Sequence, residues 1–164
     1  MGAPGKDALE VVVGDLMEQR GLTLAVAESC TGGLVSHRIT DVPGCSTYYH
    51  GSVTTYSNAV KASALGVSGD TLNRYGAVSE QTAREMAQGV RRFLGADVGL
   101  SVTGVAGPDG GTPEKPVGLV YVGLAAPDGV WVARHLWPGD RWENKAASAE
   151  AVLDLLRRYL EGAL

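Results

Sequence analysis

Residues 25–33 read Ala-Val-Ala-Glu-Ser-Cys-Thr-Gly-Gly, and this stretch predicts a strand that runs into a helix through a polar turn. The apolar run from Leu22 to Ala27 suits a buried strand, and residues 34–39 space their apolar side chains as a helix does. Ser29 and Thr31 therefore lie at a helix N-terminus, where free N–H groups and the helix dipole stabilise a phosphate or an oxyanion. Ser and Thr are also ordinary helix caps, so the turn has a purely structural interpretation as well.

The rest of the chain alternates between helical and strand patterns. Helices are expected over 7–21, 58–65, 79–94 and 141–160, and strands over 52–56, 96–103, 117–125 and 130–137. Pro127-Asp128-Gly129 lies between the last two strands and predicts an antiparallel hairpin. Helices before and after nearly every strand cover both faces of a sheet. We therefore expect an α/β protein, a three-layer α/β/α sandwich with a mixed, mostly parallel sheet and an antiparallel hairpin.

Composition narrows the class of protein. The chain has 164 residues, of which 45% are hydrophobic and 20% charged, and this size predicts one domain over 1–164 with a core of about 7–160. The net charge of −4, with scattered basic residues, gives no footprint for nucleic acid. No apolar run approaches the roughly 20 residues of a membrane helix. Cys30 and Cys45 without a signal peptide favour a reducing compartment, so we expect a cytoplasmic protein that binds a small molecule, not nucleic acid or a membrane.

Neither a metal nor a cofactor is expected. His37, His50 and His135 stand far apart, with no metal-ligand spacing around them, so surface or packing roles are favoured for them. A Ser-His-Asp triad is not excluded by spacing alone, because its members meet only in the fold. Cys30 at a helix start is a further possible nucleophile, although small buried thiols are common and its side chain follows Ser29 directly.

Lys61 is the residue that offers base chemistry without histidine. It follows Tyr56 by five residues, so both side chains reach one rim of the sheet if a helix begins near Ser57. A lysine acts as a base only if burial or a neighbouring cation lowers its pKa, by roughly 3 units from 10.4. A neutral amine then takes the proton of a serine hydroxyl. The structural interpretation is a solvated lysine on a helix.

Several ordered motifs together resemble the CinA C-terminal domain family. They are Ala-Glu-Ser-Cys-Thr-Gly-Gly at 27–33, Tyr-Ser-Asn-x-x-Lys at 56–61, Gly-Ala-Val-Ser at 76–79, Gly-x-Ala-Gly-Pro-Asp-Gly-Gly at 104–111, Lys-Pro-Val-Gly at 115–118 and Pro-Gly-Asp-Arg at 138–141. The likeness runs from about Asp7 to Leu160. Stand-alone members of this family are nicotinamide mononucleotide amidohydrolases, also called PncC. In longer relatives the module follows a separate domain that resembles molybdopterin-binding proteins, which we expect to be absent here.

The resemblance implies hydrolysis of the nicotinamide mononucleotide carboxamide to nicotinic acid mononucleotide and ammonia, in pyridine nucleotide salvage. Lys61 is then the base and Tyr56 orients it or helps to activate it. Ser29 and Ser46 are both possible nucleophiles, and Ser46 is favoured because its loop is free to approach a base. Cys45 replaces the first serine of the Gly-Ser-Ser that is usual in this segment and leaves Ser46 in register.

The remaining positions are expected to bind the substrate. Thr103 and the loop from Gly104 to Gly111 close over the nucleotide, and the Arg141 fork suits a phosphate. The full set expected to bind substrate is Glu28, Thr31, Gly32, Gly33, Thr103, Gly104, Gly107 and Arg141.

Two further expectations concern partners and a rival function. Related proteins associate, so a homo-oligomer is expected, with Tyr48, Tyr49, Trp131 and Trp137 as possible interface residues. Core packing is the alternative role for these aromatic side chains. The rival to an enzyme is a non-catalytic module that binds a nucleotide or phosphate with the same loops, in which Lys61 stays protonated and exposed.

Overall fold

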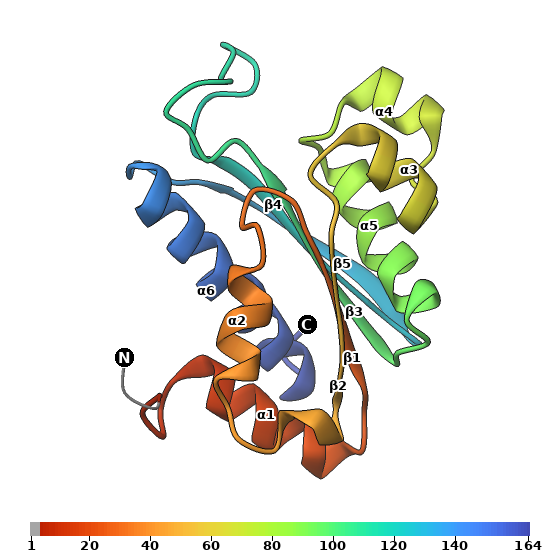
Figure 1. Ribbon diagram of the computed structural model, residues 1–164, viewed down its shortest axis with the longest axis vertical. Helices are drawn as coiled ribbons and strands as arrows, with labels where there is room; N and C mark the ends of the chain where they lie inside the picture. Colours follow the sequence, from red (N-terminus) through yellow and green to blue (C-terminus); the bar gives the residue numbers. More distant parts are fainter. Residues whose placement is uncertain (1–3) are drawn as a thin grey trace.

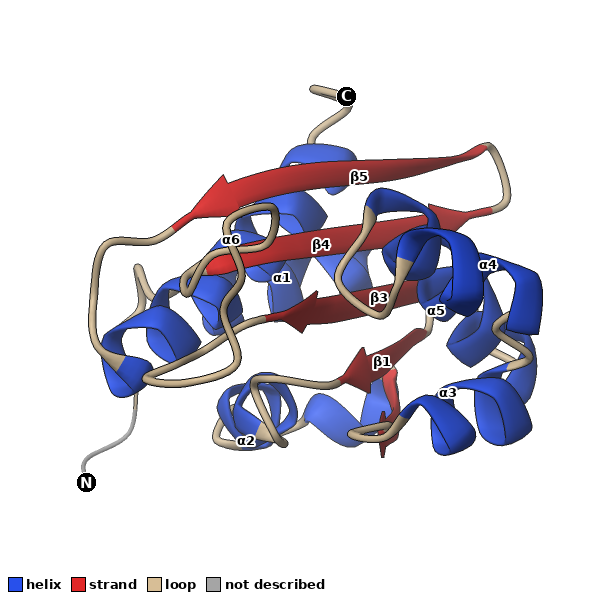
Figure 2. Ribbon diagram, turned by 90° about the horizontal axis from the view of Figure 1, so that it is seen from above, coloured by secondary structure: helices blue, strands red, loops and turns tan. Residues whose placement is uncertain are grey.

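A five-stranded sheet in the order β2-β1-β3-β4-β5 forms the centre of the computed structural model, which describes residues 4–164. Its strands are β1 (Leu24–Glu28), β2 (Tyr49–Thr54), β3 (Val98–Gly104), β4 (Leu119–Ala126) and β5 (Gly129–Leu136). β1 pairs in parallel with both β2 and β3, whereas β3–β4 and β4–β5 are antiparallel pairs. β4 is therefore the one strand of this sheet that opposes the others, as the arrows in Figure 2 show.

Helices cover both faces of this sheet. They are α1 (Leu9–Arg20), α2 (Leu34–Thr40), α3 (Asn58–Leu65), α4 (Gly69–Tyr75), α5 (Glu80–Phe93) and α6 (Arg141–Leu160), with a short 3₁₀ turn, η1, at Cys45–Thr47. α1, α2 and α6 lie on one side of the sheet, and α3, α4 and α5 on the other (Figure 1). The predicted three-layer α/β/α sandwich with a mixed sheet and an antiparallel hairpin is confirmed.

Side-chain alternation along β1 divides the core between the two faces. Leu24 and Val26 enter the larger cluster beneath α1, α2 and α6, while Ala25 and Ala27 enter the smaller cluster beneath α3 and α5. Successive side chains of a strand point to opposite faces. By the same alternation Glu28, the last residue of β1, lies on the side of α2.

Close packing between α3 and α5 fixes the position of Lys61. A Cβ at Gly89 of α5 would lie 2.1 Å from the Leu65 carbonyl oxygen at the end of α3. Glycine is therefore required for the two helices to approach this closely. α3 is held against α5, and the Lys61 side chain is fixed with it.

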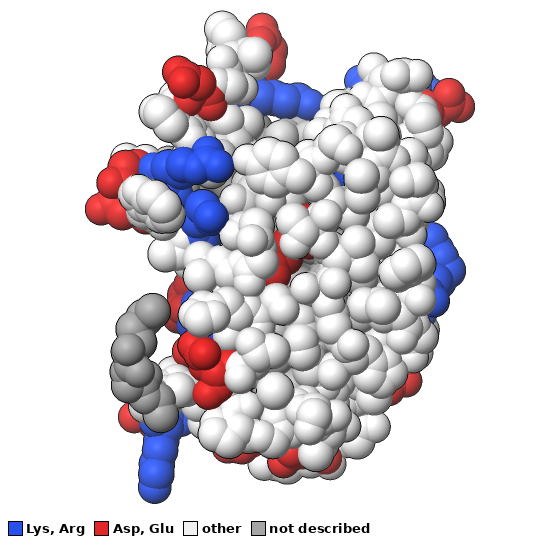
Figure 3. All heavy atoms as spheres, in the orientation of Figure 1, with Lys and Arg blue, Asp and Glu red and all other residues white. Residues whose placement is uncertain are grey.

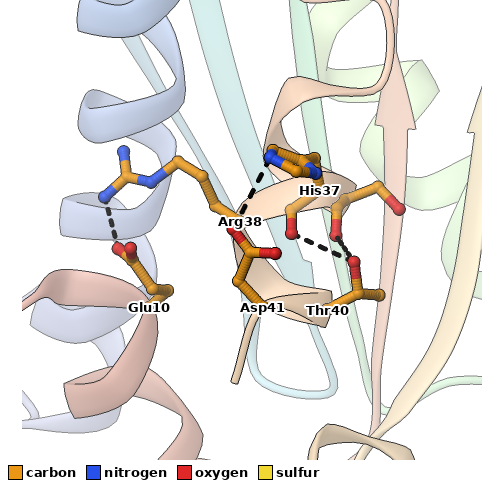
Figure 4. A network of polar contacts seen from close by, with 6 residues as sticks. Glu10, His37, Arg38, Thr40 and Asp41 are labelled. Carbon is orange, nitrogen blue, oxygen red and sulfur yellow. Dashed lines mark hydrogen bonds and ion pairs between the residues drawn. The ribbon is translucent and has the colours of Figure 1, made fainter. Parts of the chain in front are cut away.

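An ion-pair network holds α2 in place on the other face (Figure 4). The Arg38 guanidinium lies 2.5 Å from Glu10 of α1 and 2.7 Å from Glu150 of α6. His37 and Asp41 pair locally at 3.5 Å. Because Arg38 contacts both neighbouring helices, it fixes the position of the helix that follows the 29–33 turn.

The prediction and the structure differ at two elements. The strand expected over 52–56 runs instead from Tyr49 to Thr54, so Thr55 and Tyr56 lie beyond its end. α4 was not predicted, because its seven residues present no long apolar stripe. The helices expected over 58–65 and 141–160 have those bounds.

The four aromatic residues considered for an interface make contacts within the chain. Tyr48 is buried, and the Tyr49 hydroxyl donates to Ser36 Oγ at 2.7 Å. Trp131 packs on Tyr159 at 5.3 Å between ring centroids, and Trp137 Nε1 donates to Ser148 Oγ at 3.1 Å. These contacts favour the packing role, and the homo-oligomer stays a prediction.

The surface shows no broad basic region on the face in Figure 3, where Lys and Arg lie singly or in small groups among uncharged and acidic residues. Among the helices of residues 4–164, none combines the length and apolar character needed to cross a membrane.

Candidate functional site

A cavity of about 260 Å³ opens where the parallel strands end. Its walls come from the turn after β1, from α3 and the residues before it, from Ala77 and Val78, from the loop after β3, and from the first residue of α6. Ligands of open α/β sheets bind at this edge, beyond the carboxyl ends of the strands. The cavity brings together these predicted site residues: Ser29, Tyr56, Lys61, Thr103, Gly104, Gly107 and Arg141.

Lys61 and Ser29 form a direct contact at the base of this cavity. Lys61 Nζ lies 3.0 Å from Ser29 Oγ, 2.7 Å from the Thr55 carbonyl oxygen and 3.4 Å from the Tyr56 carbonyl oxygen. The lysine is 1% exposed and the serine 8%. The amine is thus held on three sides, by two main-chain carbonyls and one hydroxyl.

Local sequence explains why Lys61 points inward. The Ser57 side chain caps α3 by accepting a hydrogen bond from the Val60 N–H at 3.3 Å. That cap starts the helix directly after Thr55 and Tyr56, and Lys61 then lies on the face that packs toward the sheet. Because β2 ends at Thr54, the carbonyls of the next two residues are available to the amine.

The surroundings of Lys61 favour the neutral amine. Burial lowers its pKa from the ordinary value of 10.5, with the nearby Cys30 acting in the opposite direction. Within residues 4–164 no carboxylate forms an ion pair with it. Contacts with two neutral carbonyls and a hydroxyl do not compensate a buried ammonium as a negative partner would, so the charged form is disfavoured.

Glu28 does not reach the cavity. Its carboxylate accepts hydrogen bonds from the N–H groups of Gly33 (3.0 Å), Val35 (3.1 Å) and Ser36 (2.8 Å), and the side chain is 0% exposed. The carboxylate of Glu28 therefore occupies the N-terminus of α2, where a bound anion was expected. The expectation that this helix start holds a phosphate or an oxyanion is wrong, because the donors are already used.

Thr31, Gly32 and Gly33 also lie outside the cavity lining. Thr31 is fully buried, and its hydroxyl has no partner among the described residues. Gly32 and Gly33 have positive φ values of 61° and 101°, which glycine adopts without strain. These residues shape the turn between β1 and α2, so their position does not match the direct substrate contact expected of them.

Cys30 has the properties of a core thiol. It is 5% exposed, and burial raises the pKa of its thiol to about 11. A nucleophilic cysteine needs a lowered pKa. The main-chain N–H of Cys30 is of more interest, because within residues 4–164 neither it nor the N–H of Thr31 donates to another backbone or side-chain acceptor.

Tyr56 and Arg141 meet at the rim of the cavity. Arg141 Nη2 donates to the Tyr56 hydroxyl at 3.2 Å, and Nη1 donates to the Gly107 carbonyl at 2.6 Å. Tyr56 is 62% exposed, so its hydroxyl is not directed at the Ser29–Lys61 pair. Its contact with Lys61 is made by the backbone carbonyl alone.

The wall after β3 is tied to its neighbours by polar contacts. Thr103 Oγ1 donates to the Ala77 carbonyl at 2.7 Å, which joins two sides of the cavity. Asn144, which sequence reasoning missed, donates from Nδ2 to the Ala106 carbonyl at 3.0 Å and accepts from the Gly139 N–H at 3.1 Å. A buried amide in the first turns of an otherwise ordinary amphipathic helix was the available signal.

Ser46 lies at the opposite end of the strands from the cavity, where β2 begins. It belongs to η1, which precedes β2, whereas Lys61 follows the end of that strand. The six residues of β2 span roughly 20 Å at about 3.3 Å per residue. The expectation that the Ser46 loop approaches the base is wrong. It rested on the loop being free, but the topology places that loop at the amino end of β2.

The histidines lie away from the cavity. His37 pairs with Asp41, His50 Nδ1 contacts the Leu94 carbonyl at 3.0 Å, and His135 stacks on Trp137 with centroids 4.7 Å apart. In the described part of the chain no group of three or more His, Cys, Asp or Glu residues could hold a metal ion.

The family model described as the CinA C-terminal domain matches residues 6–160. The chain belongs to this family. A protein of Halothermothrix orenii named for competence-damage induction is 56% identical over 150 residues, which cover 91% of this chain and 36% of that protein. A CinA-like protein of Desulfotalea psychrophila is 49% identical over 155 residues, covering 94% of this chain and 38% of that protein. The chain therefore spans less than two fifths of the length of these CinA relatives.

Solved structures of CinA proteins share the whole fold. The competence/damage inducible protein CihA of Agrobacterium tumefaciens superposes with a TM-score of 0.88 at 36% identity, covering 98% of this chain and 99% of that one. A CinA superfamily protein of Klebsiella pneumoniae gives 0.92 at 29% identity, covering 97% and 99%. The α/β architecture described above is thus that of the CinA C-terminal domain.

Proposed function

We propose that this chain is an amidohydrolase that converts nicotinamide mononucleotide to nicotinic acid mononucleotide and ammonia in pyridine nucleotide salvage, with Ser29 as nucleophile and Lys61 as base. The observation that carries the proposal is the 3.0 Å contact between Ser29 Oγ and a buried Lys61 Nζ without an acidic partner. A neutral amine has two N–H bonds and one lone pair. The two carbonyls of Thr55 and Tyr56 match the N–H bonds, which leaves the lone pair for the Ser29 hydroxyl proton.

The reaction follows from this arrangement. The Ser29 proton passes to Lys61 Nζ as Oγ bonds to the carboxamide carbon, giving a tetrahedral oxyanion. The lysine ammonium then returns a proton to the departing nitrogen, so ammonia leaves and an ester remains on Ser29. Water gives a proton to Lys61 as its oxygen bonds to the ester carbon. The lysine ammonium returns that proton to Ser29 Oγ as the ester bond breaks, and the acid product loses its own proton to solvent as the carboxylate.

A main-chain donor next to the nucleophile supports the oxyanion step. Cys30 directly follows Ser29 and lines the cavity, and its N–H is unused by other groups of residues 4–164. A backbone donor fixed before the reaction stabilises developing negative charge without reorganisation. In this proposal it replaces the α2 terminus, whose donors Glu28 occupies.

Arg141 supports a nucleotide as the substrate. Its guanidinium lies at the cavity rim beside the Tyr56 hydroxyl, while the Tyr56 carbonyl contacts Lys61. A ligand that reaches both the base and the guanidinium carries an amide at one end and an anion at the other. A planar fork with free donors suits a phosphate.

The free thiols of Cys30 and Cys45 fit a reducing compartment, and we propose a cytoplasmic location on that basis.

The test is ammonia release from nicotinamide mononucleotide by the purified chain, with nicotinic acid mononucleotide identified as the second product. Ser29→Ala and Lys61→Met should each reduce turnover by roughly 10³-fold or more, since removing a member of such a pair disables the whole step. Ser46→Ala is the matched control and should retain full activity. Binding of the nucleotide without turnover from about pH 6 to 10 would instead identify a non-catalytic binding module.

A further inference from the structure

The loop from Val105 to Gly118 is fixed at its base and exposed at its tip. Its ends pair with each other, because the Val105 N–H donates to Leu119 and the Gly118 N–H donates to the Val105 carbonyl, at 2.9 and 2.8 Å. Asn144 and Arg141 hold it from the side of α6. Residues 108–114 are exposed. Figure 1 shows this loop projecting on the opposite side of the site from α3 and α4.

Lys115 is the residue that links this loop to the opposite wall. Its Nζ donates to the Tyr75 carbonyl at the end of α4. The same Nζ lies 2.7 Å from the place where a Cβ at Gly76 would stand, so the glycine leaves room for it. The carbonyls of a last helical turn lack intrahelical partners and carry partial negative charge, and a lysine is a favourable partner for them.

Both ends of the link are otherwise well fixed. On the loop side, the Thr112 N–H donates to the Lys115 carbonyl at 2.9 Å, and the Lys115 N–H donates to Thr112 Oγ1 at 3.0 Å. On the other side, the Gly76 carbonyl accepts from Ser79 Oγ at 3.0 Å and from Thr82 Oγ1 at 2.7 Å. The Lys115 side chain therefore joins two ordered segments across the opening.

The cavity lies between the segments that Lys115 joins. Gly104–Gly107, Asp109 and Gly110 line one side of it, and Ala77 and Val78 line the other. Thr103 connects these walls deep in the cavity, at β3, and Lys115 connects them again at the exposed part of the loop. The two contacts together hold the walls at a fixed distance, both deep in the cavity and near its opening.

We propose that Lys115 is a positioning residue that holds the 105–118 loop at the distance from the 75–78 segment that the bound substrate requires. This inference rests on the proposed amidohydrolase function for its kinetic part alone. Lys115 does not line the cavity, so it acts through the loop wall and not on the reacting atoms.

The first measurement is hydrogen–deuterium exchange on the ligand-free protein, which does not depend on any activity. In Lys115→Met, the amides of Thr112, Lys115 and Gly76 should exchange several-fold faster than in the native chain. Lys115→Arg retains a donor to the carbonyl and should restore slow exchange. Lys6→Met is the matched control, because it removes an exposed lysine that is far in sequence from the 105–118 loop. Unchanged exchange in Lys115→Met would overturn the proposed link.

The second measurement is steady-state kinetics with nicotinamide mononucleotide. Losing one exposed helix-end contact of this kind should raise KM about two- to fivefold in Lys115→Met, with kcat unchanged and recovery in Lys115→Arg. The nucleoside that lacks the phosphate distinguishes positioning from direct phosphate binding. A loop effect raises KM for both compounds alike, whereas a rise confined to the phosphorylated compound would overturn the proposal. If the native chain has no turnover, the proposed function fails and the exchange experiment still decides the role of Lys115.

Discussion

Replacing Glu28 with glutamine tests whether the buried carboxylate stabilises the turn that carries Ser29. The carboxylate accepts from three N–H groups, two on Oε2 and one on Oε1, and no part of the side chain is exposed. A glutamine places an NH₂ group where one of these oxygens stood. In the better orientation the amide oxygen keeps the bonds from Gly33 and Val35, and the NH₂ faces the Ser36 N–H.

The expected loss of stability is about 3 kcal/mol. Hydrogen bonds to a charged acceptor contribute about 1.5–3 kcal/mol against about 1 for neutral ones, and a buried donor left without a partner costs a further 1–3 kcal/mol. At roughly 2–4 °C per kcal/mol for a chain of this size, the melting temperature of Glu28→Gln should fall by about 6–12 °C.

Thermal unfolding by circular dichroism measures this fall, and chemical denaturation at fixed temperature measures the free energy of unfolding. Glu143→Gln is the matched control, because Glu143 accepts from the Asp140 N–H at 2.8 Å in an exposed capping box that glutamine satisfies equally well. The control should melt within about 1 °C of the native chain. If Glu28→Gln does the same, the cost of burying the carboxylate cancels its three bonds and the reasoning is refuted.

Further predictions concern the base, the thiol and metal dependence. Because burial lowers the pKa of Lys61 below its unfolded value of 10.5, the unfolded chain binds one more proton between the two values, and stability should rise with pH over that interval. Between pH 7 and 9.5, the free energy of unfolding should rise less in Lys61→Met than in the native chain. An equal rise in the two proteins would contradict a lowered pKa of Lys61. The acidic limb of kcat/KM should likewise lie below pH 10.5, and a limb at or above it would show that Lys61 titrates normally. Cys30→Ala should retain at least half of the native kcat, since the thiol is buried with its pKa raised to about 11, and loss of turnover would assign the thiol a chemical role. Dialysis against a chelator should leave ammonia release unchanged, and activity restored by a divalent ion would contradict the metal-free mechanism.

The fold followed from the sequence wherever one local pattern dominated. Strong periodicity gave the helix over 141–160, and the turn at 127–129 gave the hairpin of β4 and β5. The end of β2 was misplaced, because Thr55 and Tyr56 have the side chains of strand residues, yet the strand ends at Thr54 and their carbonyls accept from Lys61. Strand propensity describes side chains and does not register such a main-chain contact.

The site could be predicted only in part, for a topological reason. Lys61, Ser29, Thr103 and Arg141 lie at or just beyond the strand ends and helix starts where the sequence placed them, and they line one cavity. Ser46 was misassigned because a loop between two elements can lie at the amino ends or at the carboxyl ends of the strands. The composition of the loop does not distinguish the two positions. Glu28 was misassigned because a carboxylate beside a glycine-rich turn can bind a ligand or cap its own helix, and only the side-chain direction distinguishes the two roles.

The acceptors that hold Lys61 belong to the main chain at positions 55 and 56, and this has an evolutionary consequence. Every amino acid carries the same carbonyl, so a substitution at Tyr56 changes the side chain at the rim of the cavity while preserving a main-chain acceptor for the amine. The rim is thus free to diversify without any change in what holds Lys61.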